Sequence, residues 1–343
     1  MFKLKNYTVF FSKYKKKLIN YFLFKYLSRY KNIILFNAAG YNNIGDDIIA
    51  FYLKKRFEKK SSIFNIDFNN LEKVKNNLRK LQLIPINIED VNNFYKKNTL
   101  IICGGGTIIN PLVFTNDYYL EKIKKFQEEG FKVVFLGIEA TGFDNKNLAK
   151  NVFLKSLFIG VRNIQTKKLI LNLYNKNGKK PLIFITYDLV EHINFKKSRN
   201  EDIKEKIAGI CISPKIKINQ EKIKLIIDKL INKKYIVEFF SFCNHTTYPP
   251  ENDLDTAKII KEKYFKKNTK VKIFDLVNIN DTINHLDNYS LIITTRLHTT
   301  IIAHIKEIPV YNINWEDKCK NYCFNNNLFN GNIDDLLKRI NQL

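Results

Sequence analysis

Short apolar runs rich in β-branched residues recur along this chain and alternate with longer stretches that have helical patterning. One example is the run at residues 291–295, which is too short for a typical helix. It is followed by a helical stretch at 297–306 and by a second short run at 310–313. Such an alternation is typical of βαβ units, whose strands form a parallel sheet with helices on both faces.

The alternation occurs in two series separated by a polar, charged stretch at residues 194–206. We expect strands in the first series at 33–37, 63–66, 99–103, 132–136, 153–160 and 182–186, with helices at 46–59, 71–83, 117–129 and 163–174. In the second series we expect strands at 208–213, 235–240, 271–274, 291–295 and 310–313, with helices at 219–233, 253–267, 280–288 and 297–306. The sequence therefore predicts two doubly wound α/β domains, 33–193 and 207–343, that face each other across a cleft and are joined by a linker at 194–206.

The charge of the chain would by itself suggest a polyanionic partner. Its 343 residues include 58 Lys and Arg against 33 Asp and Glu, a formal net charge of +25. Lysine far outnumbers arginine, however, and Asn and Ile are abundant, as a bias toward A/T-rich codons would produce. Since no nucleic-acid-binding motif is present, we expect no nucleic-acid partner.

The five cysteines form neither a disulfide framework nor the spacing of a zinc site. We therefore expect a reducing compartment and no structural metal.

Residues 1–31 contain nine Lys or Arg and no acid, and aromatic residues follow a helical spacing among them. The segment lacks the features of a signal peptide, and no stretch of the chain has the apolar length of a transmembrane helix. Two interpretations stay open. Residues 1–32 could form a basic amphipathic helix on an anionic membrane surface, or a first helix that packs on its own domain. We expect a cytoplasmic protein, attached under the first interpretation to the inner face of the plasma membrane.

The turn after the predicted strand 291–295 carries Arg296 and His298. Ligands of open parallel sheets bind beyond the carboxyl ends of the strands, where this turn would lie. A guanidinium beside the amides that open the next helix favours an anion, and an imidazole can carry a proton near neutral pH. The alternative is that Arg296 pairs with a carboxylate and His298 caps the helix.

A loop of sequence Gly-Tyr-Asn-Asn-Ile-Gly-Asp-Asp spans residues 40–47 after the first predicted strand. Gly45 permits close approach of a ligand to the backbone, and the Asn43 amide can both donate and accept hydrogen bonds. Asp46 or Asp47 could act as a base. Alternatively, Asp46 caps the following helix and Asp47 lies in its first turn.

A second glycine cluster follows the predicted strand 99–103, and bare backbone there would admit a phosphate, a carboxylate or a sugar. It has the spacing of neither a Walker loop nor a dinucleotide-binding motif. Its residues are Gly104, Gly105, Gly106 and Thr107.

Four further residues follow predicted strands. Arg162 is a second basic residue, and His245, in a loop with two prolines, is a second candidate proton carrier. Trp315 and Lys318 lie beyond strand 310–313, where a sugar ring could stack and a phosphate could be held.

These motifs together resemble the polysaccharide pyruvyl transferase family. Its members carry a G-x-x-N-x-G-D-[DE] loop, matched by residues 40–47, and a glycine-rich turn, matched by 104–106. A V-R-x-x-x-[ST] segment is matched by Val161, Arg162 and Thr166. The most specific motif, R-[LY]-H followed by an apolar helix and G-x-P-V, is matched by Arg296, His298 and residues 309–310, with Lys318 beyond them. The chain departs from the family pattern at Thr299 and Glu307, where glycine is usual.

The resemblance implies a GT-B-like pair of Rossmann-type domains that transfers a pyruvyl group from phosphoenolpyruvate to a sugar of a surface polysaccharide or its lipid-linked precursor, with no cofactor or metal. Arg296 and Arg162 would hold the two anionic groups of the donor, and His298 would be the acid. Asp46 or Asp47 would accept the hydroxyl proton. Two other classes stay open: a GT-B nucleotide-sugar glycosyltransferase, and a non-catalytic basic protein.

Overall fold

The computed structural model describes residues 23–105, 116–175, 177–195, 205–216, 219–245, 252–275 and 278–343. The chain divides into two compact units. Unit 1 comprises the described residues up to Gly40 together with Ile49–His192. Unit 2 comprises Tyr41–Ile48 and the described residues from Ile193 onward. The glycine-containing loop 40–47 therefore belongs almost entirely to unit 2, although it follows the first strand of unit 1.

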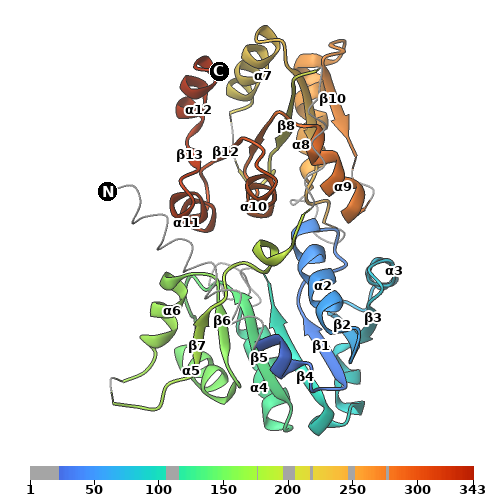
Figure 1. Ribbon diagram of the computed structural model, residues 1–343, viewed down its shortest axis with the longest axis vertical. Helices are drawn as coiled ribbons and strands as arrows, with labels where there is room; N and C mark the ends of the chain where they lie inside the picture. Colours follow the sequence, from blue (N-terminus) through green and yellow to red (C-terminus); the bar gives the residue numbers. More distant parts are fainter. Residues whose placement is uncertain are drawn as a thin grey trace. The chain divides into compact units, whose positions relative to one another are not determined.

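The described part of unit 1 forms a seven-stranded sheet in the order β3-β2-β1-β4-β5-β6-β7, with parallel pairing throughout (Figure 1). Its order reverses between β1 and β4, which makes their carboxyl ends the switch point of a doubly wound sheet. The strands are β1 (Asn32–Phe36), β2 (Ser62–Asp67), β3 (Ile84–Asn87), β4 (Thr99–Gly104), β5 (Lys132–Ile138), β6 (Ile159–Val161) and β7 (Ile183–Ile185). The helices are α2 (Ile44–Phe57), α3 (Glu72–Lys80), α4 (Asn116–Glu128), α5 (Lys146–Lys155) and α6 (Ile164–Leu171), with short 3-10 turns η1 (Ile88–Asn93), η2 (Lys96–Asn98) and η3 (Leu189–His192). The first residues of α2, up to Ile48, belong to unit 2.

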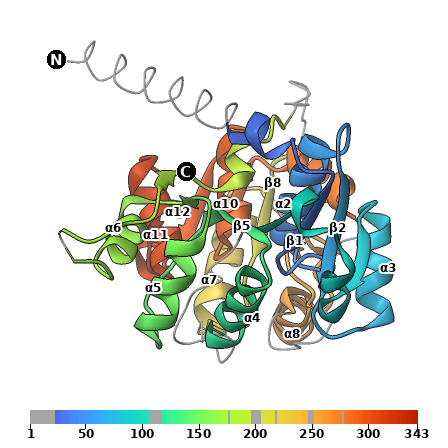
Figure 2. The same cartoon turned by 90° about the horizontal axis from the view of Figure 1, so that it is seen from below.

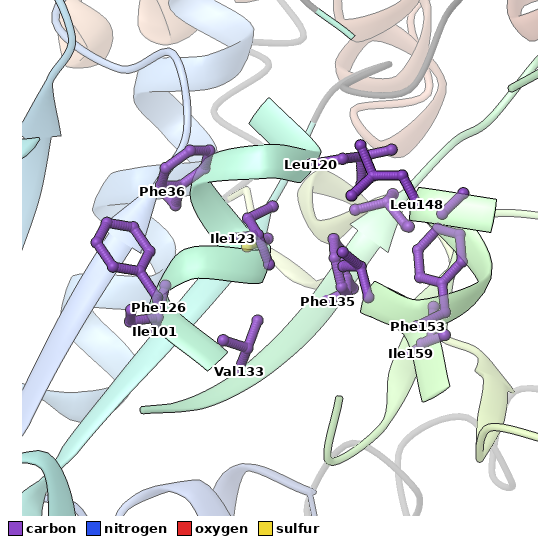
Figure 3. Packing of buried hydrophobic residues seen from close by; sticks show 14 of the residues in the cluster. Phe36, Ile101, Leu120, Ile123, Phe126, Val133, Phe135, Leu148, Phe153 and Ile159 are labelled. Carbon is purple, nitrogen blue, oxygen red and sulfur yellow. The ribbon is translucent and has the colours of Figure 1, made fainter. Parts of the chain in front are cut away.

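One large apolar cluster of unit 1 lies between the sheet and the helices α4 and α5, which lie side by side (Figure 2). Phe126 of α4 contacts Phe36 of β1 with ring centroids 6.3 Å apart, and Phe153 of α5 contacts Phe135 of β5 at 5.2 Å (Figure 3). These side chains are almost fully removed from water. Burial of apolar surface of this kind is the dominant favourable term in folding.

The described part of unit 2 forms a six-stranded parallel sheet in the order β10-β9-β8-β11-β12-β13, which repeats the order of unit 1 (Figure 1). Its switch point therefore lies at the carboxyl ends of β8 and β11. The strands are β8 (Ile207–Cys211), β9 (Ile236–Phe240), β10 (Val271–Phe274), β11 (Leu291–Thr294), β12 (Val310–Ile313) and β13 (Phe329–Gly331). The helices are α7 (Gln220–Asn232), α8 (Asp253–Phe265), α9 (Ile279–His285), α10 (Leu297–Ile305), α11 (Asp317–Asn325) and α12 (Ile333–Asn341), with a 3-10 turn η5 (Leu286–Asn288).

The strands of unit 2 carry apolar side chains on both faces, as expected for a sheet covered on both sides. On one face, Ile210, Phe239 and Ile293 pack in a cluster with apolar residues of α7, α8 and α12. Helix α10 is also buried along much of its length, and Ile301 and Ile302 are fully shielded from solvent.

The prediction of two Rossmann-like doubly wound domains is confirmed, but the strand expected at 153–160 is wrong in its first half. Phe153 lies in α5, and the strand that follows, β6, begins only at Ile159. The aromatic and β-branched residues near Phe153 suggested a strand. A helix forms instead because the Asn145 side chain accepts a hydrogen bond from the Leu148 amide and caps its first turn.

The end of the N-terminal basic segment packs on unit 1. Residues 23–27 are helical, and Leu27 is fully buried. The Phe24 ring lies 5.4 Å from that of Phe57 in α2, and the Arg56 guanidinium lies 4.9 Å from its centroid. Residues 1–22 of the predicted amphipathic helix and 196–204 of the predicted linker lie outside the described residues. None of the described helices is long and apolar enough to cross a membrane.

Candidate functional site

The turn between β11 and α10 is held by hydrogen bonds that its own two threonines accept. Thr294 Oγ1 accepts from the Arg296 amide at 3.0 Å, and Thr295 Oγ1 accepts from the amide of Ser213, beyond β8, at 2.8 Å. The Thr295 carbonyl accepts from Trp315 Nε1 at 2.8 Å. Trp315, considered from the sequence as a stacking residue, thus helps to fix this turn at the switch point of unit 2.

Arg296, the residue before α10, is paired with the buried carboxylate of Asp253. Its Nη2 lies 2.5 Å from Asp253 Oδ1, and its Nε lies 3.2 and 3.3 Å from the two carboxylate oxygens. Burial tends to lower the pKa of Arg296, but the nearby Asp253 carboxylate outweighs it and raises that pKa above its ordinary value. The guanidinium is therefore charged, and two of its three nitrogens engage Asp253.

His298, in the first turn of α10, lies against the backbone of Gly45. A Cβ atom built on Gly45 would lie only 1.7 Å from His298 Nδ1, so no other residue fits there without moving the imidazole. Both residues belong to unit 2. The structure therefore brings together two residues that are far apart in the sequence and were predicted separately as catalytic and substrate-binding.

The first turn of α2 carries the two candidate bases. The helix begins at Ile44, and Asn43 caps it: its Oδ1 accepts from the Gly45 amide at 3.2 Å. The alternative in which Asp46 is the cap is therefore wrong. Asp46 and Asp47 both lie in the first turn beyond Gly45, Asp46 partly exposed and Asp47 buried.

This turn of α2 is anchored to the chain beyond β9 in unit 2. Asn43 and Cys243 form an antiparallel bridge, with the Ile44 amide donating to the Phe242 carbonyl at 3.0 Å. Next to it, the rings of Tyr41 and His245 stack with centroids 5.4 Å apart. His245, the second candidate proton carrier, therefore lies beside the loop that leads to Gly45.

Arg162, the second predicted anion ligand, lies in a buried ionic cluster of unit 1. Its Nη2 lies 2.7 Å from Asp188 Oδ2 and its Nη1 lies 3.7 Å from Glu139 Oε2. Glu139 also accepts from Asn163 Nδ2 at 2.9 Å, and Asn163 caps α6. The Arg162 side chain is 6% exposed. The cluster joins the segments that follow β5, β6 and β7.

The described glycines of the second cluster have a packing reason of their own. Gly105 has φ +77°, and a Cβ there would lie 2.8 Å from Ile49 of α2. Glycine is favoured at such a backbone conformation, and here it also lets α2 approach. Gly104 ends β4 with ordinary contacts. Gly106 and Thr107 lie outside the described residues.

The structure also places Lys318, Thr299 and the five cysteines. Lys318, in the first turn of α11, pairs with Glu316 at 2.6 Å. Thr299, which replaces a usual glycine, is fully buried with its hydroxyl 4.0 Å from Cys211 Sγ, so its side chain faces the interior of unit 2. All five cysteines are free and buried. Among the described residues, no group of three or more His, Cys, Asp or Glu could hold a metal ion.

Asp253, the partner of Arg296, was not singled out from the sequence. Only the Asn252-Asp253 pair at the expected start of α8 could have drawn attention, and such a pair reads as an ordinary helix cap. Its contacts with Arg296 come from a residue 43 positions away and have no local signal.

The family model for polysaccharide pyruvyl transferase matches residues 7–317, nearly the whole chain. The chain belongs to the polysaccharide pyruvyl transferase family. The predicted family and the predicted enzyme class are thereby confirmed. A comparison with curated protein sequences finds no match.

Solved structures similar to this polysaccharide pyruvyl transferase family member include two epimerases. UDP-GlcNAc 2-epimerase from Neisseria meningitidis has a TM-score of 0.59 at 9% identity, covering 91% of this chain and 90% of that one. The Methanocaldococcus jannaschii UDP-GlcNAc 2-epimerase has a TM-score of 0.56 at 15% identity, with 90% and 91% coverage. MurG of Acinetobacter baumannii has a TM-score of 0.50 at 10% identity, with 91% and 89% coverage. At these identities the likeness shows the fold alone, and that fold is GT-B-like.

Proposed function

We propose that this enzyme transfers the pyruvyl group of phosphoenolpyruvate to two hydroxyls of a sugar in a surface polysaccharide or its lipid-linked precursor, forming a ketal. Family membership supports the substrate class. The contact between His298 and Gly45 carries the proposal, because it joins a proton carrier to the helix turn that bears two carboxylates, Asp46 and Asp47.

The reaction needs one proton at a defined carbon atom. Two sugar oxygens bond to the central carbon of the donor, the bond from that carbon to the phosphate oxygen breaks, and the methylene carbon gains a proton to become a methyl group. One hydroxyl proton balances the proton given to carbon, and the other balances the departing phosphate. A general acid and a general base within one site suit this sequence of steps.

Each residue has a role that fits its position. His298 delivers the proton to the methylene carbon, and Asp46 or Asp47 accepts a hydroxyl proton or orients the sugar. Arg296 and the amides that open α10 favour the anionic groups of the donor. Arg162 was predicted to bind a second anionic group of the donor, but that group would compete with Glu139 and Asp188 for the guanidinium. We therefore rest the proposal on Arg296 and His298.

The decisive experiment offers phosphoenolpyruvate and a nucleotide sugar as separate donors, each with lipid-linked and soluble sugar acceptors. We expect consumption of phosphoenolpyruvate, release of inorganic phosphate and a product mass that corresponds to a pyruvyl ketal. Release of a nucleoside diphosphate from the nucleotide sugar alone would instead identify a glycosyltransferase on the same fold.

We also propose that residues 1–31 attach the enzyme to an anionic membrane at the inner face of the plasma membrane, where a lipid-linked acceptor would be available. Nine basic residues without an acid support this. Each lysine near such a surface contributes about 1 kcal/mol, weakened by salt. Removal of residues 1–22, which spares the packed residues Phe24 and Leu27, should abolish binding to anionic vesicles and retain activity on a soluble acceptor. Equal vesicle binding by the truncated enzyme would contradict the proposal.

A further inference from the structure

A single buried carboxylate, that of Asp253, contacts Arg296 and the backbone amides of residues 242–243, and residues 242–244 pair with the segment that leads to Gly45. Asp253 is the first residue of α8, and its side chain has no exposed surface. It touches the backbone beyond β9 on one side and Arg296 on the other.

On the first side, Asp253 fixes the chain at residues 242–244. Its Oδ2 accepts from the amides of Phe242 at 3.1 Å and Cys243 at 3.0 Å, while its own amide donates to the Cys243 carbonyl at 2.9 Å. Residues 242–244 in turn pair with 42–44: the Asn244 amide donates to the Asn42 carbonyl at 2.9 Å. Gly45 is the next residue, so its position depends on this pairing.

On the second side, Asp253 holds Arg296 through two guanidinium nitrogens. Arg296 is the residue before α10, and His298 lies in the first turn of that helix. The bidentate geometry restricts both the direction and the rotation of the guanidinium. Asp253 therefore restrains the segment that carries His298 as well as the segment that carries Gly45.

We infer that Asp253 is a positioning residue for His298 in the pyruvyl transfer, acting through Arg296 and through residues 242–244. This inference rests on the proposed function for its catalytic consequence. Asp253 does not act on the substrate itself. It sets the distance and orientation of the imidazole relative to the first turn of α2, and a misplacement of about 1 Å in an active site can cost on the order of 100-fold in rate.

The test compares two isosteric substitutions, Asp253→Asn and Asp287→Asn. Asp287 is a matched control because it is also a buried aspartate of unit 2 with a basic partner, Lys306, at 2.7 Å. An asparagine at position 253 has a single oxygen, so its NH2 group must replace the oxygen that faces either the two amides or Arg296 Nη2. We expect Asp253→Asn to lower kcat by about 100-fold per folded molecule. Asp287→Asn should lower stability and retain kcat.

A second measurement does not require turnover. The enzyme has five histidines, so the imidazole Hε1 resonance of His298 can be assigned by substitution and followed by NMR. We expect this resonance to shift in Asp253→Asn and to stay in place in Asp287→Asn. If Asp253→Asn does not fold, the double variant Asp253→Asn/Arg296→Gln removes both charges of the pair, and we expect it to fold with the His298 resonance still displaced.

The outcomes separate this inference from the proposed function. An unchanged His298 resonance and an unchanged kcat in Asp253→Asn would overturn the positioning role while leaving the transfer reaction in place. A double variant that regains both stability and the wild-type His298 resonance would show that Asp253 only neutralises a buried charge. If the wild-type enzyme does not consume phosphoenolpyruvate, the proposed function fails, and the NMR comparison still decides whether Asp253 positions His298.

Discussion

Two arginines follow strands of the two sheets, and each pairs with a buried aspartate, yet their surroundings differ. Arg162 follows β6 in unit 1 and pairs with Asp188 at 2.7 Å. Arg296 follows β11 in unit 2 and pairs with Asp253 at 2.5 Å. From the sequence both were expected to bind the donor. The side chain of Arg162 is 6% exposed and that of Arg296 is 15% exposed.

The difference lies in what each ion pair holds. Arg162 has a second carboxylate, Glu139, whose other partner is the residue that caps α6, so the cluster ties together the sheet edge of unit 1. The partner of Arg296 reaches instead to residues 242–243, and the helix that follows Arg296 bears His298. A basic residue at a strand end can therefore tie neighbouring strands together or brace the turn of a candidate site, and its neighbours decide which.

The largest effect on turnover is expected for His298→Gln, in the segment that follows Arg296. Glutamine keeps polar contacts but cannot deliver a proton, so turnover should fall roughly 100- to 10,000-fold while the donor Kd is retained. Steady-state kinetics and calorimetric titration with phosphoenolpyruvate measure the two quantities. His304→Gln is the control: it lies on the same helix and bonds Tyr322 at 2.9 Å. Unchanged turnover in His298→Gln would make His245 the next candidate acid.

Gly45→Ala should disrupt the contact between Gly45 and His298 in unit 2 without removing any functional group. The added Cβ would occupy the position of the His298 ring, and the imidazole must move. We expect kcat to fall about 100-fold with the circular dichroism spectrum retained. Gly178→Ala is the matched control, because a Cβ at that exposed glycine has no neighbour closer than 3.6 Å. Wild-type kcat in Gly45→Ala would show that the precise place of His298 is unimportant.

Arg296→Lys and Arg162→Lys compare the two ion pairs directly. A lysine keeps the charge but loses the bidentate geometry. Arg296→Lys should weaken donor binding roughly tenfold, the equivalent of one charged hydrogen bond. Arg162→Lys should mainly lower the free energy of unfolding, by about 1–3 kcal/mol. Donor titration and urea unfolding of both variants give the result. An equal rise in the donor Kd for both would show that Arg162 also binds the donor.

Much of this architecture could be predicted because its signals are local. The short apolar runs that became β4, β9 and β11 are bounded within one or two residues of the observed strands, since β-branched residues there are buried on both faces. The family motifs likewise marked Gly45 and His298. The short edge strands β3 and β13 were missed, because their half-buried residues carry little hydrophobic pattern.

The contacts of the candidate site could not be predicted in the same way. Gly45 was expected to admit a ligand, whereas the structure places His298 against it. The pairing of residues 42–44 with 242–244 joins parts of the chain some two hundred positions apart. No sequence periodicity predicts such a contact, and Asp253, which bonds residues 242–243 and Arg296, therefore had no distinguishing local signal.

The smallest effect concerns a third polar cluster, at Glu238 in β9, which we expect to serve only the fold. Burial tends to raise the pKa of the Glu238 carboxyl, but hydrogen bonds from His285 and Tyr289 outweigh it and lower that pKa below its ordinary value of 4.5. The unfolded chain therefore binds this proton more readily. The stabilisation is present above pH 4.5 and is lost as the pH falls through the lower folded-state pKa.

Glu238→Gln should flatten this acid dependence in urea unfolding between neutral and acidic pH, with kcat retained. Glu262→Gln, in an exposed pair with Lys266, is the control and should leave the curve unchanged. A Glu238→Gln enzyme with the wild-type acid dependence would show that the Glu238 cluster contributes nothing to that dependence. A loss of kcat would show that the cluster in β9 also supports the reaction.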